Sequence, residues 1–541
     1  MIPAWIFAAL ALLPVSAPPA KFVISGIVVD ERTQQPIKHA LVTVTQNEHP
    51  DRNASLFTSA DGHFTFTDVP AAKYTLQAEV HGEQRTFEQD GQYSTGIVTG
   101  PGLDSEHIVF RFSVPGSIAI KIEDEEGEPV PGAQVTLFAK DVNAGWPQIR
   151  LVMQNATDNE GALRLAHLQP GTYYLAVMGR PWYAQNQPGP QTPEQQSETA
   201  ALDVAYPLTY YPSTQNPSAA APITLAAGEK VQLQMTLRAV PAIKISLEGV
   251  PGSRDPAHNG GIMSAVEATG PGGIRFQVQS YGFQQQDGAR EIRGVAPGNY
   301  IVSVSTFGTP TRYDEPLGAA KISGSGEVKI DTSNLVRTAV AGHLSLEHPG
   351  PVNGLTLLLA QPANNQTAFC RVAQDGAFQC GEGRGLGRNL VPGYYQLRLV
   401  NTPDLYIKSV STQGGRYAGG LLQIGEGQSI QLNVVAAKGR SRLDGIALRD
   451  QKPVSGAMIL LVSRNAEPGL VVPRDQSDSD GTFTLRDVQP GQYYLLAIDH
   501  GRGLEYHNAR VLAPYLGGAQ KIDVPLVRDE RVTVNVQARG H

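Results

Sequence analysis

The chain has 541 residues, more than one hydrophobic core usually holds, and its 41% of hydrophobic residues is enough for several cores. Charged residues make up only 17%, whereas Gly (57) and Pro (39) are abundant, a turn-rich composition typical of many short strands. The formal net charge of -7 and the lack of a long Lys/Arg cluster argue against a nucleic-acid partner, because such a partner requires a basic surface.

The chain begins with an apolar segment. Residues 2–13 are almost wholly apolar, Pro14 ends the run, and Val15, Ser16 and Ala17 supply the small residues of a cleavage site. We therefore expect a signal peptide at residues 1–20, although no Lys or Arg precedes the apolar run. A buried N-terminal strand and a misassigned start codon are the alternatives. No segment is long and apolar enough for a transmembrane helix, so the expected location is extracytoplasmic, in the periplasm or at the cell surface.

One sequence motif recurs at intervals of about the length of a domain. It consists of an apolar residue, any residue, Pro-Gly, any residue and then Tyr. The first copy lacks Pro-Gly. The Tyr of each copy is placed at Tyr74, Tyr173, Tyr300, Tyr394 and Tyr493. A glycine lies upstream of each Tyr, at Gly62, Gly161, Gly288, Gly376 and Gly481. The interval from Gly to Tyr is 12 residues in four of the copies. Such regular spacing predicts five tandem copies of one domain.

The repeated motif predicts strands joined by tight turns. Asp-Gly pairs such as Asp61-Gly62 are expected to form hairpin turns in which the glycine adopts positive φ. The residues two and four positions later are mostly apolar, as Phe64 and Phe66 are, and this alternation predicts one face of a strand. Pro-Gly makes the next turn. The Tyr that follows is expected to bury its ring and to donate a hydrogen bond near that turn.

Four short segments resemble a known family. They are residues 26–30 (Gly-Ile-Val-Val-Asp), 36–40 (Pro-Ile-Lys-His-Ala), 480–483 (Asp-Gly-Thr-Phe) and 490–493 (Pro-Gly-Gln-Tyr). They resemble the carboxypeptidase regulatory-like domain, an accessory domain of metallocarboxypeptidases. The resemblance implies a transthyretin-like (prealbumin-like) β-sandwich related to collagen-adhesin B-type domains and often grouped with carbohydrate-binding-like folds. It implies no reaction, because such domains are accessory.

The expected fold is all-β, a tandem array of about five antiparallel β-sandwich domains without a helix. The third and fourth domains diverge most from the repeated pattern. After the signal peptide at residues 1–20, the expected domains are residues 21–114, 115–239 with an insert at 180–222, 240–337, 338–437 and 438–541.

Cys370 and Cys380 are the only cysteines, and they flank the turn at Asp375-Gly376. A hairpin centred on that turn places them opposite each other. We therefore expect a cross-strand disulfide formed in an oxidising compartment. Two buried thiols are the alternative.

Motifs for catalysis and metal binding are missing from the sequence. Two cysteines without a matching His cluster are an incomplete zinc set. There is no His-Glu-x-x-His motif and no Gly-x-Ser-x-Gly motif. We therefore expect no catalytic residue, no metal and no cofactor, and hence no enzyme.

The insert at residues 180–222 is rich in Pro, Gln, Ser and Thr, which pack a core poorly. It nevertheless carries five aromatic residues, which are Trp182, Tyr183, Tyr206, Tyr210 and Tyr211. Exposed aromatic side chains on a loop stack on sugars or contact proteins, so these five residues are the candidate ligand-binding residues. The alternative is a strap whose aromatic rings pin it to the sandwich.

The sequence therefore favours a secreted or periplasmic, non-catalytic binding or adhesion protein of the cell envelope, which recognises a glycan or an envelope protein through loops. Two alternatives stay open. The chain could be a purely architectural spacer of the envelope, or an accessory (regulatory) subunit of a separate secreted peptidase.

Overall fold

The computed structural model places most of the chain. It describes residues 20–185, 202–248, 261–278, 281–284, 290–307, 316–324, 327–331, 338–362, 367–380, 390, 392–400, 402, 405–418, 420–425, 427–439, 441–464, 472–525 and 531–537. The expected signal peptide, apart from residue 20, and Gly288 lie outside these residues. No helix in the described part is long and apolar enough to cross a membrane.

By their contacts, the residues divide into two compact units. The first unit comprises residues 1–89, 94–112 and 478–480, and the second comprises residues 90–93, 113–477 and 481–541. The first unit thus contains most of the first repeat, and the second contains the other four. The boundaries expected for five separate domains stay predictions.

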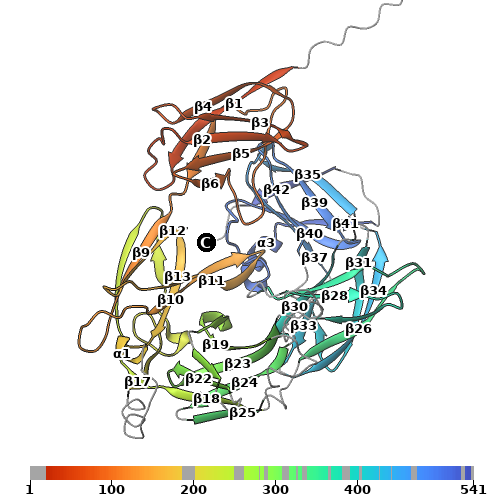
Figure 1. Ribbon diagram of the computed structural model, residues 1–541. Helices are drawn as coiled ribbons and strands as arrows, with labels where there is room; N and C mark the ends of the chain where they lie inside the picture. Colours follow the sequence, from red (N-terminus) through yellow and green to blue (C-terminus); the bar gives the residue numbers. More distant parts are fainter. Residues whose placement is uncertain are drawn as a thin grey trace, which may run out of the picture. The chain divides into compact units, whose positions relative to one another are not determined.

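The first repeat consists of two sheets (Figure 1). One has the strand order β4-β1-β8, and the other has the order β3-β2-β5-β6 with β7 paired to β5. Ile24, Val44, Phe64 and Leu76 have exposed or half-buried neighbours along their strands and are almost fully buried. The strands are β1 (Lys21–Asp30), β2 (Leu41–Gln46), β3 (His49–Phe57), β4 (His63–Pro70), β5 (Lys73–Val80), β6 (Glu83–Thr86), β7 (Ile97–Val98) and β8 (Ile108–Phe112).

The second repeat has the same two sheets with longer strands. The orders are β12-β9-β16 and β11-β10-β13-β14-β17, with β15 paired to β13. The elements are β9 (Gly116–Glu123), β10 (Gln134–Asn143), β11 (Trp146–Ala156), β12 (Ala162–Leu168), β13 (Gly171–Gly179), α1 (Trp182–Gln185), β14 (Val204–Tyr210), η1 (Pro217–Ala219), β15 (Ile223–Leu225), β16 (Lys230–Thr236) and β17 (Val240–Pro241).

The third repeat forms two four-stranded sheets, with the orders β21-β22-β18-β25 and β20-β19-β23-β24. The elements are β18 (Ile243–Glu248), β19 (Gly261–Thr269), η2 (Pro271–Gly273), β20 (Arg275–Gln277), β21 (Tyr281–Gln284), β22 (Arg290–Val295), β23 (Gly298–Phe307), β24 (Pro316–Gly324) and β25 (Glu327–Asp331).

In the fourth repeat the strands join into one nine-stranded sheet, with the order β31-β34-β26-β29-β28-β27-β30-β33-β32. The join is the pairing of β28 with β29. The strands are β26 (Ala339–Leu346), β27 (Thr356–Ala360), β28 (Thr367–Val372), β29 (Ala377–Cys380), β30 (Gly393–Val400), β31 (Leu405–Gln413), β32 (Arg416–Ala418), β33 (Leu421–Ile424) and β34 (Ser429–Lys438).

The fifth repeat has the order β36-β35-β42-β40-β37-β38, with β39 paired to β35 and β41 paired to β40. The elements are β35 (Ser441–Arg449), β36 (Lys452–Pro453), β37 (Met458–Ser463), β38 (Arg474–Gln476), β39 (Thr482–Val488), β40 (Gly491–Ile498), α3 (Ala509–Leu516), β41 (Gln520–Val524) and β42 (Arg531–Gln537).

The structure thus confirms the all-β sandwich fold, but the sheets are not purely antiparallel. In every repeat the first strand pairs in parallel with the last long strand of that repeat. The pairs are β1 with β8, β9 with β16, β18 with β25, β26 with β34, and β35 with β42. The alternating pattern could not reveal this, because alternation reports which face of a strand is buried and not the direction of its neighbour.

The turns at the repeated glycines have positive φ, as expected for the Asp-Gly pairs, but they make different connections. Gly62, Gly161, Gly376 and Gly481 have φ between 70° and 87°. Only Gly376 lies in a hairpin, between β28 and β29. In the first, second and fifth repeats the strands on either side of the glycine belong to different pairings, as β3 with β2 and β4 with β1 do. The hairpin prediction is therefore wrong for Asp61-Gly62 and Asp480-Gly481, because each of these turns connects two strands that pair with different partners.

The recurrent Tyr has the expected structural role in three repeats. Its hydroxyl donates a hydrogen bond to the carbonyl four residues earlier, from Tyr74 to Pro70 (3.0 Å), from Tyr173 to Gln169 (2.5 Å) and from Tyr493 to Gln489 (2.8 Å). All three rings are buried, as is the ring of Tyr300.

Tyr394 does not occupy this position in the fourth repeat. Its side chain is 55% exposed, whereas the neighbouring Tyr395 is 1% exposed. Counted from the Gly of Pro-Gly, Tyr395 stands where Tyr173 and Tyr493 stand. Successive residues of β30 point to opposite faces of the sheet, so of two adjacent tyrosines only one can have its ring in the core. The repeat position is therefore Tyr395.

The disulfide is confirmed. Cys370 and Cys380 are directly opposite on β28 and β29, and their sulfur atoms are 2.01 Å apart.

Helix α3 was not expected from the sequence. Asn508 caps it by accepting a hydrogen bond from the backbone N–H of Arg510 (3.1 Å). Leu512 and Tyr515 pack into a cluster with Met458 and other residues of β37 and β40, on a face separate from the main core of the repeat. The helix covers an apolar sheet face that would otherwise be exposed, and Figure 1 shows it beside β40.

The assignment of the repeat position can be tested by truncating each of the two tyrosines. Tyr395→Ala is expected to lower the free energy of unfolding of the fourth repeat by about 3 kcal/mol or more, because it removes a buried ring. Tyr394→Ala is the matched control and should change it by less than about 0.5 kcal/mol. Chemical denaturation of the full chain checks this. Equal destabilisation by the two substitutions would contradict the assignment.

Removing the disulfide should loosen the same repeat. We expect Cys370→Ala/Cys380→Ala to destabilise it by about 2–3 kcal/mol, because the open chain gains the freedom of a short loop. Calorimetry of the oxidised and reduced protein, compared with this variant, measures the change. Reduction that leaves the unfolding temperature unchanged would count against the expected stabilisation.

Candidate functional site

The insert of the second repeat is only partly a surface loop. Its residues 204–210 form β14, which pairs with β13 and extends the larger sheet. Tyr206 and Tyr210 are 2% and 1% exposed, and burial raises the pKa of both hydroxyls. Tyr211 is half-buried against the core of the same repeat. The expected exposure is therefore wrong for Tyr206 and Tyr210, whose rings are anchors of the sandwich.

Tyr210 lies where the second and third repeats share one apolar cluster. Its hydroxyl donates a hydrogen bond to the carbonyl of Thr269 (3.1 Å). Phe138 of β10 meets Phe276 of β20 edge to face, with ring centroids 5.1 Å apart. The cluster includes Ala176 and Met178 from the second repeat and many residues of the third. Apolar side chains of the two repeats are therefore buried against each other in this cluster.

Trp182 and Tyr183 are the exposed part of the predicted site. Their side chains are 66% and 41% exposed, and their rings meet edge to face with centroids 5.8 Å apart. The pKa of Tyr183 is raised by burial and by the nearby carboxylates of Glu125 and Asp124. The structure thus places an exposed aromatic pair beside an acidic turn. Ligand binding by this pair stays a prediction.

A second candidate site, which we call the arginine pocket, lies within the second unit. It is a cavity of about 440 Å³ lined by Gln92, Tyr93, Ala144, Trp146, Gln396, Arg398, Val472, Pro473, Arg474, Asp475, Thr484, Arg486, Asp487, Tyr506 and His507. The lining comes from the segment between β6 and β7, the end of the β10–β11 hairpin, β30, the fifth repeat between Val472 and Asp487, and the segment before α3. Four aromatic rings and three guanidinium groups therefore meet around one small cavity.

The hairpin end is fixed on the fifth repeat by ring stacking. Trp146 and His507 are stacked, with ring centroids 4.3 Å apart and an interplanar angle of 16°. A Cβ at Gly145 would lie 2.4 Å from the ring of Tyr506, so only glycine allows this close approach. Figure 1 shows the tip of the β10–β11 hairpin, where β11 begins, beside α3.

Arg474 is the most enclosed cation of the pocket. Its side chain is only 6% exposed and forms an ion pair with Asp90. The guanidinium lies over the ring of Tyr93, 4.6 Å from the centroid, and 5.8 Å from that of Tyr506. Cation–π contacts of this kind hold a guanidinium in place while its other N–H groups stay available.

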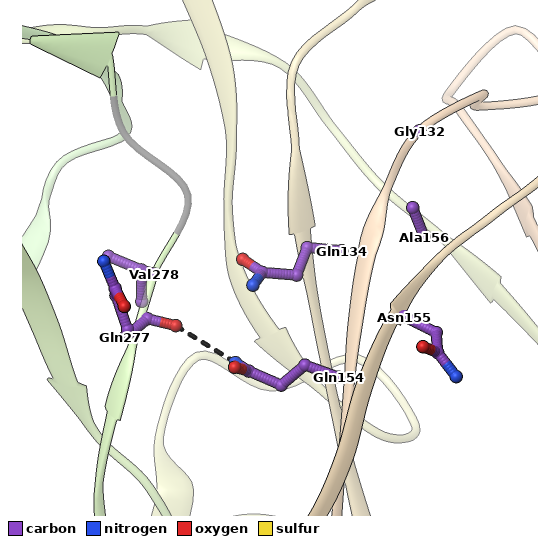
Figure 2. A pocket seen from close by; sticks show the side chains of 7 residues that line it. All are labelled: Gly132, Gln134, Gln154, Asn155, Ala156, Gln277 and Val278. Carbon is purple, nitrogen blue, oxygen red and sulfur yellow. Dashed lines mark hydrogen bonds between the residues drawn. The ribbon is translucent and has the colours of Figure 1, made fainter.

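A further cavity, of about 370 Å³, lies between the second and third repeats and is lined mainly by amides (Figure 2). The side-chain amide of Gln154 donates a hydrogen bond to the carbonyl of Gln277 (3.0 Å). Figure 2 shows Gln134 extending toward the same side, whereas Asn155 points away. The lining has no titratable side chain and no aromatic ring. It is therefore a weaker candidate than the arginine pocket.

Within the part of the chain that the structure describes, no group of three or more His, Cys, Asp or Glu side chains could hold a metal ion.

Sequence reasoning missed the arginine pocket because its residues are scattered along the chain between positions 92 and 507. One signal was present. Ala144-Gly145-Trp146 is a glycine turn followed directly by a large aromatic ring.

The stack of Trp146 on His507 should depend on pH. Burial, together with the nearby charge of Arg398, lowers the pKa of His507 to about 4, although a hydrogen bond with the backbone of Ala144 opposes the shift. The unfolded chain therefore takes up the proton first as the pH falls below about 6.5. The contribution of His507 to the free energy of unfolding should decrease by up to about 3 kcal/mol between pH 6.5 and 4, and this contribution should not change further below pH 4.

Chemical denaturation at several pH values measures this decrease. His507→Phe keeps an aromatic ring but does not titrate, so the variant should lack this part of the pH dependence. Identical pH profiles for the variant and the unmodified protein would contradict the prediction.

Comparison with known proteins connects one part of the chain to a family. Residues 23–99 match the family model of the carboxypeptidase regulatory-like domain. No curated protein matches the chain. Among solved structures, the minor pilin of Streptococcus agalactiae is 14% identical, with a TM-score of 0.21, over 40% of this chain and 96% of the pilin.

Two further structures have similar values. The pilus adhesin SpaC of Lactobacillus rhamnosus GG, in its open conformation, is 11% identical, with a TM-score of 0.18, over 78% of this chain and 44% of the adhesin. The major pilin BcpA of Bacillus cereus is 12% identical, with a TM-score of 0.13, over 78% of this chain and 99% of the pilin. Likenesses this low carry no argument about function. The family match, by contrast, confirms the resemblance drawn from the sequence of the first repeat.

Proposed function

We propose that the chain is a non-catalytic, extracytoplasmic recognition protein whose sandwiches carry a ligand site. The observation that carries the proposal is the arginine pocket, where aromatic rings and guanidinium groups line one cavity. Sites for small polar ligands are typically concave, with apolar rings and a few fixed polar groups. The lining combines both kinds of group.

The extracytoplasmic location is supported by the disulfide between Cys370 and Cys380, because such bonds persist in oxidising compartments. The apolar segment at residues 2–13 is consistent with export.

A carbohydrate is the ligand class that we favour. Aromatic faces stack on the C–H groups of a sugar, and amide and guanidinium groups pair with its oxygen atoms. The exposed pair Trp182 and Tyr183 offers a second surface of this kind.

An architectural role is the second candidate, and the shared apolar cluster of the second and third repeats favours it. A rigid joint between sandwiches is expected of a spacer, whereas a flexible linker is not. The accessory-subunit alternative rests only on the family match, since such domains accompany peptidases.

A glycan array tests the proposal and separates the two surfaces. We expect the mature protein to bind at least one glycan. Arg398→Gln reports on the arginine pocket, Trp182→Ala/Tyr183→Ala reports on the exposed pair, and Phe57→Ala alters an exposed ring of the first repeat (67% exposed) as the control. Binding that is lost in only one of the first two variants locates the site. No binding on the whole array would overturn the carbohydrate proposal and leave the architectural role.

A further inference from the structure

Two hydrogen-bond donors in the arginine pocket are buried without a partner. They are the indole Nε1 of Trp146 and the Nε of Arg474. Both residues line the cavity, and the side chain of Arg474 is 6% exposed. Buried donors that lack a partner are unfavourable and rare in folded proteins. A ligand that brings oxygen acceptors would satisfy both.

The three lining guanidinium groups have different partners. Arg474 is paired with the carboxylate of Asp90, whereas Arg398 donates a hydrogen bond to the neutral side-chain oxygen of Gln396 (2.8 Å). One oxygen of Asp475 accepts a hydrogen bond from the backbone N–H of Thr484 (2.6 Å). The ion pair of Arg474 with Asp90 leaves its Nε without a partner. The pocket therefore offers a ligand two donor groups on cations, the guanidinium of Arg398, which is bonded to a neutral amide, and the Nε of Arg474.

From these observations we propose that the arginine pocket binds a sugar that carries a carboxylate group. The inference rests on the proposed function and names the ligand class of the same pocket. A guanidinium matches a carboxylate through paired N–H donors. The rings of Trp146, Tyr93 and Tyr506 and the amides of Gln92 and Gln396 suit the apolar and hydroxyl faces of a sugar ring.

The size of the cavity and the charges around it restrict the class of ligand further. A volume of about 440 Å³ falls within the range of small-ligand pockets. The two lining carboxylates repel a doubly charged phosphate more than a singly charged carboxylate. A neutral sugar would leave the guanidinium of Arg398, which is bonded to the amide of Gln396, without a carboxylate partner. A uronic acid meets both conditions.

Calorimetric titration of the full chain with trigalacturonate, and with its fully methyl-esterified form as the matched neutral probe, tests this inference. We expect trigalacturonate to bind and the ester to bind at least roughly tenfold more weakly, because esterification removes the charge that the guanidinium groups pair with. Binding should weaken as salt is added.

Two variants locate the ligand. Trp146→Phe keeps an aromatic ring for the stack on His507 but removes the indole N–H, and Arg398→Gln removes a cation at an exposed position. Each should weaken trigalacturonate binding roughly tenfold or more. Phe57→Ala, at an exposed ring of the first repeat (67% exposed), should leave it unchanged. Near-ultraviolet circular dichroism verifies that each variant is folded.

Equal affinity for the acid and its ester would overturn the inference, as would undiminished binding by the two pocket variants or no binding of trigalacturonate. Glycan binding on the array that depends on Trp182 and Tyr183 would still support the proposed function. Failure of the acidic-sugar inference can therefore be distinguished from failure of the proposed glycan recognition.

Discussion

The larger sheet of the second repeat is buried on both faces, and this burial determines where other segments of the second unit can contact it. In β13, Leu175 and Val177 point into the core of the second repeat, while Ala176 and Met178 point into the cluster shared with the third. The strand therefore has no solvent face. Once both faces are covered, the sheet can meet other chain segments only at its edges and at the ends of its strands. The arginine pocket is built at such an end, where the β10–β11 hairpin extends beyond the core.

The sequence predicted features that depend on local rules. The positive φ of Gly376 and the pairing of Cys370 with Cys380 follow from a single turn, and the buried Tyr173 follows from a single strand. Features that depend on a neighbouring repeat were not predictable in the same way. Tyr210 looked exposed because its segment is rich in polar residues, yet the third repeat covers it. The unbroken apolar run at residues 175–178 was the available sign of a second covered face.

The candidate site was less accessible to sequence reasoning than the fold. Trp146, Arg398 and His507 come from three repeats, and no spacing rule connects them. Helix α3, whose preceding segment supplies His507, is short and contains Pro514, so its periodicity was too brief to detect. A pocket assembled from loop ends of several repeats depends on how those repeats pack. Only coordinates can reveal it, whereas a pocket inside one repeat would leave a pattern in every copy.

The parallel pairing of first and last strands has a mechanical consequence. The chain enters each repeat at the start of its first strand and leaves near the end of its last, and in a parallel pair these two points lie at opposite ends of the same ladder. In the fourth repeat that ladder runs from Ala339 opposite Ser429 to Leu346 opposite Ala436. Tension applied through the chain ends therefore loads all these hydrogen bonds together in shear, instead of opening them one after another. Each repeat should therefore resist unfolding when the chain is pulled from its two ends.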